Sequence, residues 1–170
     1  MLFYLEAGSR YGGIWIMKMK VEEIMTEEVV TVDENDPLPG VVSVLKENKI
    51  AGAPVINKDG EVVGVISEMD VLKVFEDFQW YTPLFKAMDI LHLHEEKLHD
   101  VEQDINRASE MKVKDIMSKR PKTLKPDDYI DDAAMIMQST GFNRLPVVDE
   151  AGKIKGIVTR SDILASLYDI

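Results

Sequence analysis

The sequence predicts an α/β (α+β) fold built from two pseudo-symmetric copies of one β-α-β-β-α unit. The line GVISEMDVL, starting at Gly64, returns as GIVTRSDIL, starting at Gly156. With the same shift of 92 positions, Val21–Phe75 lies over Val113–Leu167 without a gap. An ungapped alignment of this length, in which Gly, Pro and Asp residues coincide, indicates a tandem duplication. One copy has a sheet with helices on one side only, so we expect the copies to pack face to face and to leave clefts where they meet.

The first two elements of each copy follow from local patterns. Val29–Val32 and its counterpart Lys122–Leu124 are predicted as short strands, because turns rich in Asp and Pro follow them. A helix is expected next, since apolar residues then recur at spacings of three and four, as at Val41, Val44 and Leu45.

The next two strands of each copy are predicted to form a hairpin. Ala53–Ile56 and Leu145–Val148 are apolar, as buried strands are, and they lead through NKDG and DEAG into Val62–Ile66 and Ile154–Val158. The glycine in each turn suits a positive φ. The last strand then runs directly into the final helix of the copy.

The composition indicates a soluble protein that binds no nucleic acid. The chain has 170 residues, 45% of them hydrophobic, and a net charge of −11, whereas phosphate backbones require clustered Lys and Arg. Because there is no cysteine, thiol catalysis and thiolate metal sites are excluded. We expect a cytoplasmic location and no membrane span, since Glu6, Arg10 and Gly12-Gly13 interrupt the apolar first segment.

The predicted organisation has four parts. Residues 1–18 form an N-terminal extension, 19–75 the first repeat, 76–112 a connector and 113–170 the second repeat. Thr82-Pro83 is a good helix start, and an apolar stripe follows, so the connector is predicted as one long acidic helix. It would clamp the module or offer a surface to a second chain. His92, His94 and His99 could bind a metal there, but a partly packed, solvated helix is the preferred interpretation.

The repeated line has both a structural and a functional interpretation. Structurally, Thr159 and Asp162, like Ser67 and Asp70, can close a capping box at a helix start. Functionally, a strand-to-helix turn offers backbone N–H groups to a phosphate, the hydroxyl can donate to the same anion, and the aspartate can accept hydrogen bonds from a ribose diol. The glycine of the line would let a backbone or a flat base approach. Together these features describe a nucleotide site.

With its preceding -PV- strand and its duplication, this pattern resembles a tandem pair of cystathionine-β-synthase (CBS) domains, a Bateman module. RLPVVDEAGKIKGIVTRSDIL and IAGAPVINKDGEVVGVISEMDVL carry the resemblance, which covers Val21 to Leu167. It implies a disc-like pairing of the repeats, a homodimer, and an adenosyl ligand (AMP, ADP, ATP or S-adenosylmethionine) in the cleft between repeats.

The resemblance also implies roles for individual residues. Asp70 and Asp162 would hold ribose hydroxyls, and Ser67 and Thr159 the phosphate or ribose. Arg144 matches a position where relatives often place a basic residue for phosphate. The base pocket would be lined by residues that we do not assign to one site: Thr31, Thr123, Ala51, Gly52, Asn143 and Arg144.

The copies differ in charge next to these residues. Arg160 follows Thr159, whereas Glu68 follows Ser67, and Gly52 stands where the second copy has Arg144. We therefore predict that the Asp162 site takes the charged nucleotide, while the Asp70 site is empty or prefers a ligand without phosphate, such as adenosine or S-adenosylmethionine. The alternative is that Arg160 and Glu68 are ordinary surface charges.

The sequence thus predicts a regulatory, ligand-sensing module that passes a change on binding to a partner or a dimer face. The sequence has no P-loop, and it has no Ser, His and Asp in the order of a catalytic triad with a nucleophile elbow. We therefore expect neither catalysis nor a catalytic cofactor. The competing hypothesis is a structural scaffold that binds no ligand and docks through the acidic connector.

Overall fold

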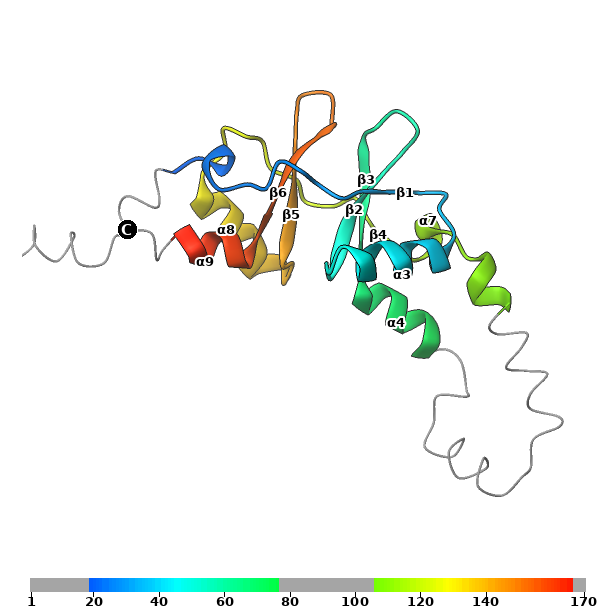
Figure 1. Ribbon diagram of the computed structural model, residues 1–170. Helices are drawn as coiled ribbons and strands as arrows, with labels where there is room; N and C mark the ends of the chain where they lie inside the picture. Colours follow the sequence, from blue (N-terminus) through cyan, green and yellow to red (C-terminus); the bar gives the residue numbers. More distant parts are fainter. Residues whose placement is uncertain (1–18, 77–105, 167–170) are drawn as a thin grey trace, which may run out of the picture. The chain divides into compact units, whose positions relative to one another are not determined.

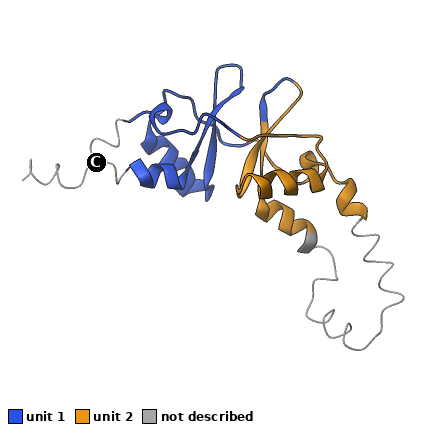
Figure 2. Cartoon of the chain, in the orientation of Figure 1, with its two compact units in different colours: residues 1–29, 59–62, 121–170 blue, residues 30–58, 63–120 orange. Residues whose placement is uncertain are grey.

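The computed structural model describes residues 19–76 and 106–166, which form two compact units (Figures 1 and 2). Unit 1 contains residues 19–29, 59–62 and 121–166, and unit 2 contains residues 30–58, 63–76 and 106–120. Neither unit coincides with one sequence repeat, because residues 19–29 of the first copy belong to the unit that holds the second copy.

Unit 2 contains a four-stranded sheet and several helices. The strands β1 (Val32–Asp33), β2 (Gly52–Ile56), β3 (Val62–Ser67) and β4 (Ser118–Lys119) follow one another in that order across the sheet. Strand β1 is parallel to β2, and β4 is antiparallel to β3. The helices α3 (Leu38–Glu47) and α4 (Glu68–Glu76) pack against each other, and the short helix α7 (Val113–Ile116) precedes β4 (Figure 1).

Unit 1 repeats this plan with a smaller sheet. The antiparallel strands β5 (Arg144–Val148) and β6 (Ile154–Thr159) lie between α8 (Ile130–Thr140) and α9 (Arg160–Ser166) in the sequence. The predicted strand Lys122–Leu124 is reduced to a single parallel bridge from Leu124 to Val147. The predicted strand Val29–Val32 is likewise too long, since β1 contains only Val32 and Asp33.

Each unit contains the first segment of the copy that otherwise forms the other unit. We call these segments the leaders: residues 19–29 lie in unit 1 and residues 113–120 lie in unit 2. In unit 1 the 3₁₀ helix η1 (Val21–Glu23) begins where Val21 N donates to Asp128 O at 2.8 Å. In unit 2 the corresponding Val113 N donates to Asp36 O at 3.0 Å. Val21 and Val113 are both 0% exposed, so each leader completes a hydrophobic core made mostly by the other copy.

Gly64 and Gly156, the glycines of the repeated line, let the leaders pack closely against the sheets. They leave no opening for a base. A Cβ on Gly156 would lie 2.5 Å from Met25 Sδ, and a Cβ on Gly64 would meet the thioether of Met117. Beside these contacts, Thr26 of one leader bridges to Ile157, and Ser118 of the other pairs with Val65. Of the two approaches that these glycines were expected to allow, the approach of another backbone segment is the one observed, and methionine side chains fill the space that a flat base would need.

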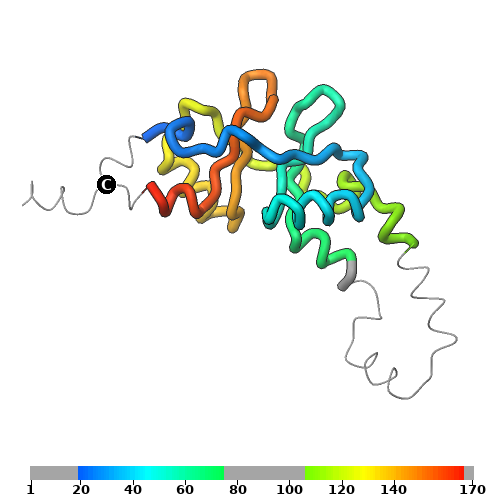
Figure 3. The backbone as a smooth tube through the Cα atoms, viewed as in Figure 1, coloured from blue at the N-terminus to red at the C-terminus, as the bar shows by residue number. Residues whose placement is uncertain are grey.

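The two hairpins have the predicted turns, which can be followed in Figure 3. Gly60 and Gly152 have φ values of 79° and 75°, where a side chain would be strained. In the second turn the Asp149 carboxylate accepts hydrogen bonds from Lys153 N and Ala151 N, each at 3.0 Å. These bonds, chiefly the one from Lys153, lower the pKa of Asp149 below its usual value.

Most of the predicted connector helix, including its three histidines, lies outside the described residues. Its end is described: residues 106–110 are helical, and Ala108 packs in a small core with Leu38, Val71 and Val74. Within residues 19–76 and 106–166, no helix has the length and apolar character needed to cross a membrane.

Candidate functional site

The strand-to-helix turn of unit 1 holds Thr159 and Asp162 in a closed capping box. Thr159 N and Thr159 Oγ1 donate to Asp162 Oδ2 at 2.7 and 2.8 Å. Asp162 N lies 3.4 Å from Thr159 Oγ1, to which it donates in return. Both residues are half-buried at the junction of β6 and α9. The turn therefore provides acceptors for backbone N–H groups at the start of α9, which have no partner within the helix.

The turn of unit 2 has the same geometry. Ser67 N and Ser67 Oγ donate to Asp70 Oδ2 at 2.9 and 2.6 Å, and Asp70 N lies 3.4 Å from Ser67 Oγ. Asp70 Oδ1 additionally lies 3.7 Å from Lys73 Nζ. The structural interpretation of the repeated line is thus realised in both copies.

This geometry limits what each side chain can give to a ligand. The hydroxyl has one proton, which it donates to the aspartate, so it meets a ligand as an acceptor. Each cap uses only one carboxylate oxygen. In the described part of the chain, Asp162 Oδ1 has no hydrogen-bond or ion-pair partner, so it is available to accept from a ligand hydroxyl.

The segment before the central strand of each unit is tied to the same turn. Arg160 N donates to Asn143 O at 3.1 Å, and in the other unit Glu68 N donates to Ala51 O at 3.1 Å. Arg144 pairs with Thr159 across β5 and β6. The structure therefore brings Asn143, Arg144 and Arg160 to the Thr159–Asp162 turn. It brings Ala51, which is followed by the buried Gly52, to the Ser67–Asp70 turn.

The two threonines predicted to line a base pocket lie further along the strands. Thr31 directly precedes β1, whose Val32 pairs with Val55. Thr123 precedes Leu124, whose N donates to Pro146 O at 2.9 Å. Among the described residues no hydrogen bond links either threonine to an aspartate of the turns. Their predicted role stays a prediction.

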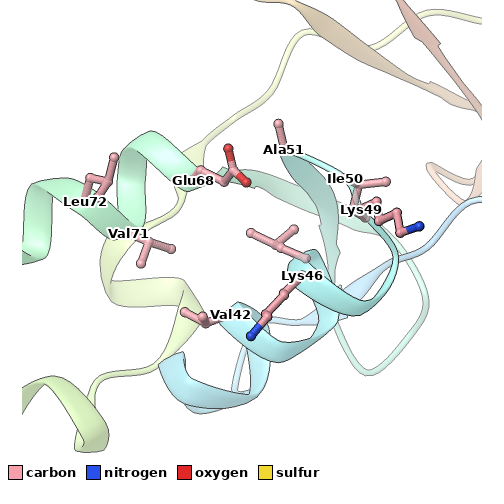
Figure 4. A pocket seen from close by; sticks show the side chains of 9 residues that line it. Val42, Lys46, Lys49, Ile50, Ala51, Glu68, Val71 and Leu72 are labelled. Carbon is pink, nitrogen blue, oxygen red and sulfur yellow. The ribbon is translucent and has the colours of Figure 1, made fainter.

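A groove of about 610 Å³ adjoins the turn of unit 2. It lies between α3 and α4, and its apolar walls include Val42, Val71 and Leu72 (Figure 4). Three charged side chains also line it: Lys46, Lys49 and Glu68. Ala51, one of the predicted site residues, belongs to the same lining.

The two lysines of this groove were missed by the sequence reasoning. The charges compared from the sequence were those at Glu68 and Arg160 and at Gly52 and Arg144. The same comparison in the first helix shows Lys46 and Lys49 against Gln138 and Gly141. The charge difference between the copies thus extends over a whole helix pair.

Unit 1 has a second groove, of about 440 Å³, that contains none of the predicted site residues. Its lining includes Glu22, Met25, Lys125, Asp149 and Glu150. The 2.6 Å contact between Lys125 Nζ and Glu150 Oε1 raises the pKa of Lys125. Within the described ranges, no group of three or more His, Asp or Glu could hold a metal ion, so we assign no metal to this groove.

The duplicated fold and the two capped turns define the class of the protein. The model of the CBS domain matches residues 21–77 and 113–169. The chain therefore belongs to the CBS-domain family and contains a tandem pair of these domains.

Similar proteins span both repeats. The uncharacterized protein MJ1426 of Methanocaldococcus jannaschii is 38% identical over 88% of this chain and 91% of its own length. The structure of CBSX2 of Arabidopsis thaliana in complex with AMP is 26% identical, with a TM-score of 0.66 over 88% of this chain and 96% of that chain. The chain spans 64% of the complete CBSX2 sequence.

A second similar structure is the CBS domain of a CBS-domain-containing membrane protein from Sphaerobacter thermophilus. It is 30% identical and has a TM-score of 0.72, covering 96% of both chains. The α+β fold of two CBS repeats is thus shared over nearly the whole chain.

Proposed function

We propose that this chain is a regulatory module without catalytic activity that binds an adenosyl ligand (AMP, ADP, ATP or S-adenosylmethionine) at its strand-to-helix turns. In this proposal Asp162 and Asp70 accept hydrogen bonds from ribose hydroxyls. Binding changes the module, and a partner or a second copy reads that change.

The observation that carries the proposal is the free carboxylate oxygen of Asp162. The cap at Thr159 uses Oδ2 only, and Oδ1 has no partner in the described ranges. A ribose edge needs an acceptor that is held in place and is not already used, and Asp162 Oδ1 meets both conditions. The complex of the similar CBSX2 with AMP supports the same ligand class.

The charges near each turn support different ligands at the two sites. Arg160 is exposed at the start of α9, and in the described part of the chain its guanidinium has no ion-pair partner. Arg144 starts the neighbouring strand opposite Thr159. Because guanidinium groups bind phosphate bidentately, we propose that the Asp162 turn holds the phosphate-bearing nucleotide.

A homodimer remains part of the proposal. On the two helices of unit 1, Met135 and Leu164 are 64% and 55% exposed. Exposed apolar side chains of this size on α8 and α9 fit a contact with a second copy.

Thermal unfolding of the full chain with AMP tests the proposal. At 100 times its dissociation constant, a ligand that binds only the folded state adds ~2.7 kcal/mol to the free energy of unfolding. We expect such a stabilisation from AMP and a weaker one from inorganic phosphate. If no adenosyl compound shifts the transition, the ligand-binding proposal is wrong and the scaffold hypothesis stands.

A further inference from the structure

The two leaders carry opposite charges at equivalent positions. Residues 19–29, the acidic leader, contain four acidic residues and one basic residue, whereas residues 113–120, the basic leader, contain three basic residues and one acidic residue. With the shift of 92 positions that relates the copies, the pair Glu27 and Glu28 lies over the pair Lys119 and Arg120. The duplicated segment thus has the same place in both copies, and the sign of its charge is reversed.

These two pairs of charges have no role in holding the units together. All four side chains are exposed. Within the part of the chain that the structure describes, none of the four takes part in an ion pair or a side-chain hydrogen bond. The charges are therefore available to a partner that lies outside the chain itself.

Backbone contacts with the sheets hold both pairs in place. Thr26, which precedes Glu27, exchanges two backbone hydrogen bonds of 3.0 Å with Ile157 of β6. Lys119 belongs to β4, the edge strand of its sheet, where it pairs with Gly64 of β3. Because the backbone beside the charges is already ordered, little conformational entropy is lost when a partner binds there.

We propose that the acidic leader of one copy of this chain binds the basic leader of a second copy. Glu27 and Glu28 of one copy then lie opposite Lys119 and Arg120 of the other. Each chain carries both surfaces, so the chain is complementary to itself. A contact between two acidic leaders, or between two basic ones, would bring like charges together and is disfavoured.

The contact decides mainly which surfaces of two copies meet. Exposed ion pairs add little affinity individually, and charge complementarity gives specificity more than affinity. We therefore expect a weak association that depends on salt. The inference goes beyond ligand binding and holds with or without a bound nucleotide.

Two double variants test the pairing by light scattering of the full chain over a range of concentrations. Glu27→Lys with Glu28→Lys makes both leaders basic, and Lys119→Glu with Arg120→Glu makes both leaders acidic. Either variant alone should associate at least ~10-fold more weakly than the wild type, because attraction between the leaders becomes repulsion. An equimolar mixture of the two should associate about as tightly as the wild type, because every contact between unlike variants joins opposite charges.

The all-basic variant separates this pairing from the effect of net charge. Its two substitutions each raise the charge by two, so the net charge moves from −11 to −7. A smaller net charge weakens the general repulsion between copies and would by itself strengthen association. Weaker association of this variant can therefore come only from the leaders.

The matched control for the all-acidic variant is Lys58→Glu with Lys153→Glu. It has the same net charge, and it changes two exposed lysines in the hairpins instead of the basic leader. It should keep the association of the wild type in low salt, apart from the small effect of general repulsion. For the wild type, raising the salt from about 0.01 M to about 1 M shortens the Debye length from ~30 Å to ~3 Å and should weaken association.

Each other outcome overturns the inference. A wild type that is monomeric at every salt concentration has no such contact, and AMP binding by that monomer would leave the ligand proposal standing. If the mixture of the two variants does not recover association, the leaders do not bind each other. If the wild type, both variants and the control all associate alike, two copies meet elsewhere, and the proposed homodimer stands without the leaders.

Discussion

The turn at Ser67–Asp70 and the turn at Thr159–Asp162 have the same backbone chemistry and different surroundings. In both, the hydroxyl and its own amide donate to one aspartate oxygen at 2.6–2.9 Å. The residue that follows the hydroxyl is Glu68 in one turn and Arg160 in the other. The duplicated cap has the same hydrogen bonds in both copies, and the charges around it differ; we propose that this difference selects different ligands.

The largest expected effect comes from the glycines that contact the leaders. It shows whether the two leaders pack equally tightly. Gly156→Ala should destabilise the protein by about 1–3 kcal/mol, because the new Cβ would overlap Met25. Gly64→Ala should cost as much, since it would overlap Met117 and also lie 3.1 Å from Ser118 O. Urea denaturation measures both free energies of unfolding.

A double-mutant cycle sharpens this comparison. Met25→Ala should recover part of the loss from Gly156→Ala, because a flexible side chain causes the clash. Met117→Ala should recover a similar part of the loss from Gly64→Ala, because the Ser118 carbonyl stays 3.1 Å from the new Cβ, much as the Met25 Cβ stays 3.2 Å from it in the other unit. No loss from either glycine substitution would mean that the leaders do not pack as described.

Charge exchange next to the caps should change ligand affinity. Arg160→Glu should weaken AMP binding about tenfold, because it puts an anion in place of a cation at the turn that is proposed to hold the phosphate. Glu68→Arg is the matched change in unit 2 and should leave the AMP affinity of the Asp162 site unaltered. Isothermal titration measures both, and an unchanged affinity in Arg160→Glu would identify Arg160 as an ordinary surface charge.

Removal of each hydroxyl tests the equality of the two caps. Thr159→Ala and Ser67→Ala should each lower the free energy of unfolding by about 1 kcal/mol, the usual loss for a cap residue. Differential scanning calorimetry without ligand provides the measurement. A much larger loss at one turn would show that its hydroxyl does more than cap the helix.

The smallest expected effect concerns Lys49. Lys49→Gly should stabilise the protein by about 1 kcal/mol or less, because it relieves the left-handed backbone. Gly141→Lys, the reverse change in the other unit, should destabilise it by a similar amount. Chemical denaturation at equal ionic strength compares the two, and a destabilised Lys49→Gly would show that Lys49 contributes to folding.

Much of the fold could be predicted because its signals are local or repeated. The hairpins were predicted from apolar strands and from Gly60 and Gly152, whose positive φ follows from the turn itself. The cap residues were found because the spacing of hydroxyl and aspartate was duplicated. Periodicity of this kind needs no knowledge of which segments meet in space.

The exchange of leaders could not be predicted in this way. Val21 and Val113 occupy equal positions in the repeats, so self-similarity does not tell which core receives which leader. For the same reason the sequence did not decide between a backbone segment and a flat base beside the glycines, because the segment that lies there comes from the leader of the other copy. The left-handed backbone of Lys49 could not be predicted either, because the presence of a lysine at a helix end does not indicate a positive φ.

The central claim is that the two aspartates have different ligands although their caps are alike. AMP titration of Asp162→Asn and Asp70→Asn tests it most directly, since asparagine keeps a cap acceptor and changes one oxygen of each site. We expect Asp162→Asn to reduce the affinity for AMP at least ~5-fold and Asp70→Asn to leave it unchanged. Equal losses in the two variants, or no loss in Asp162→Asn, would contradict the account.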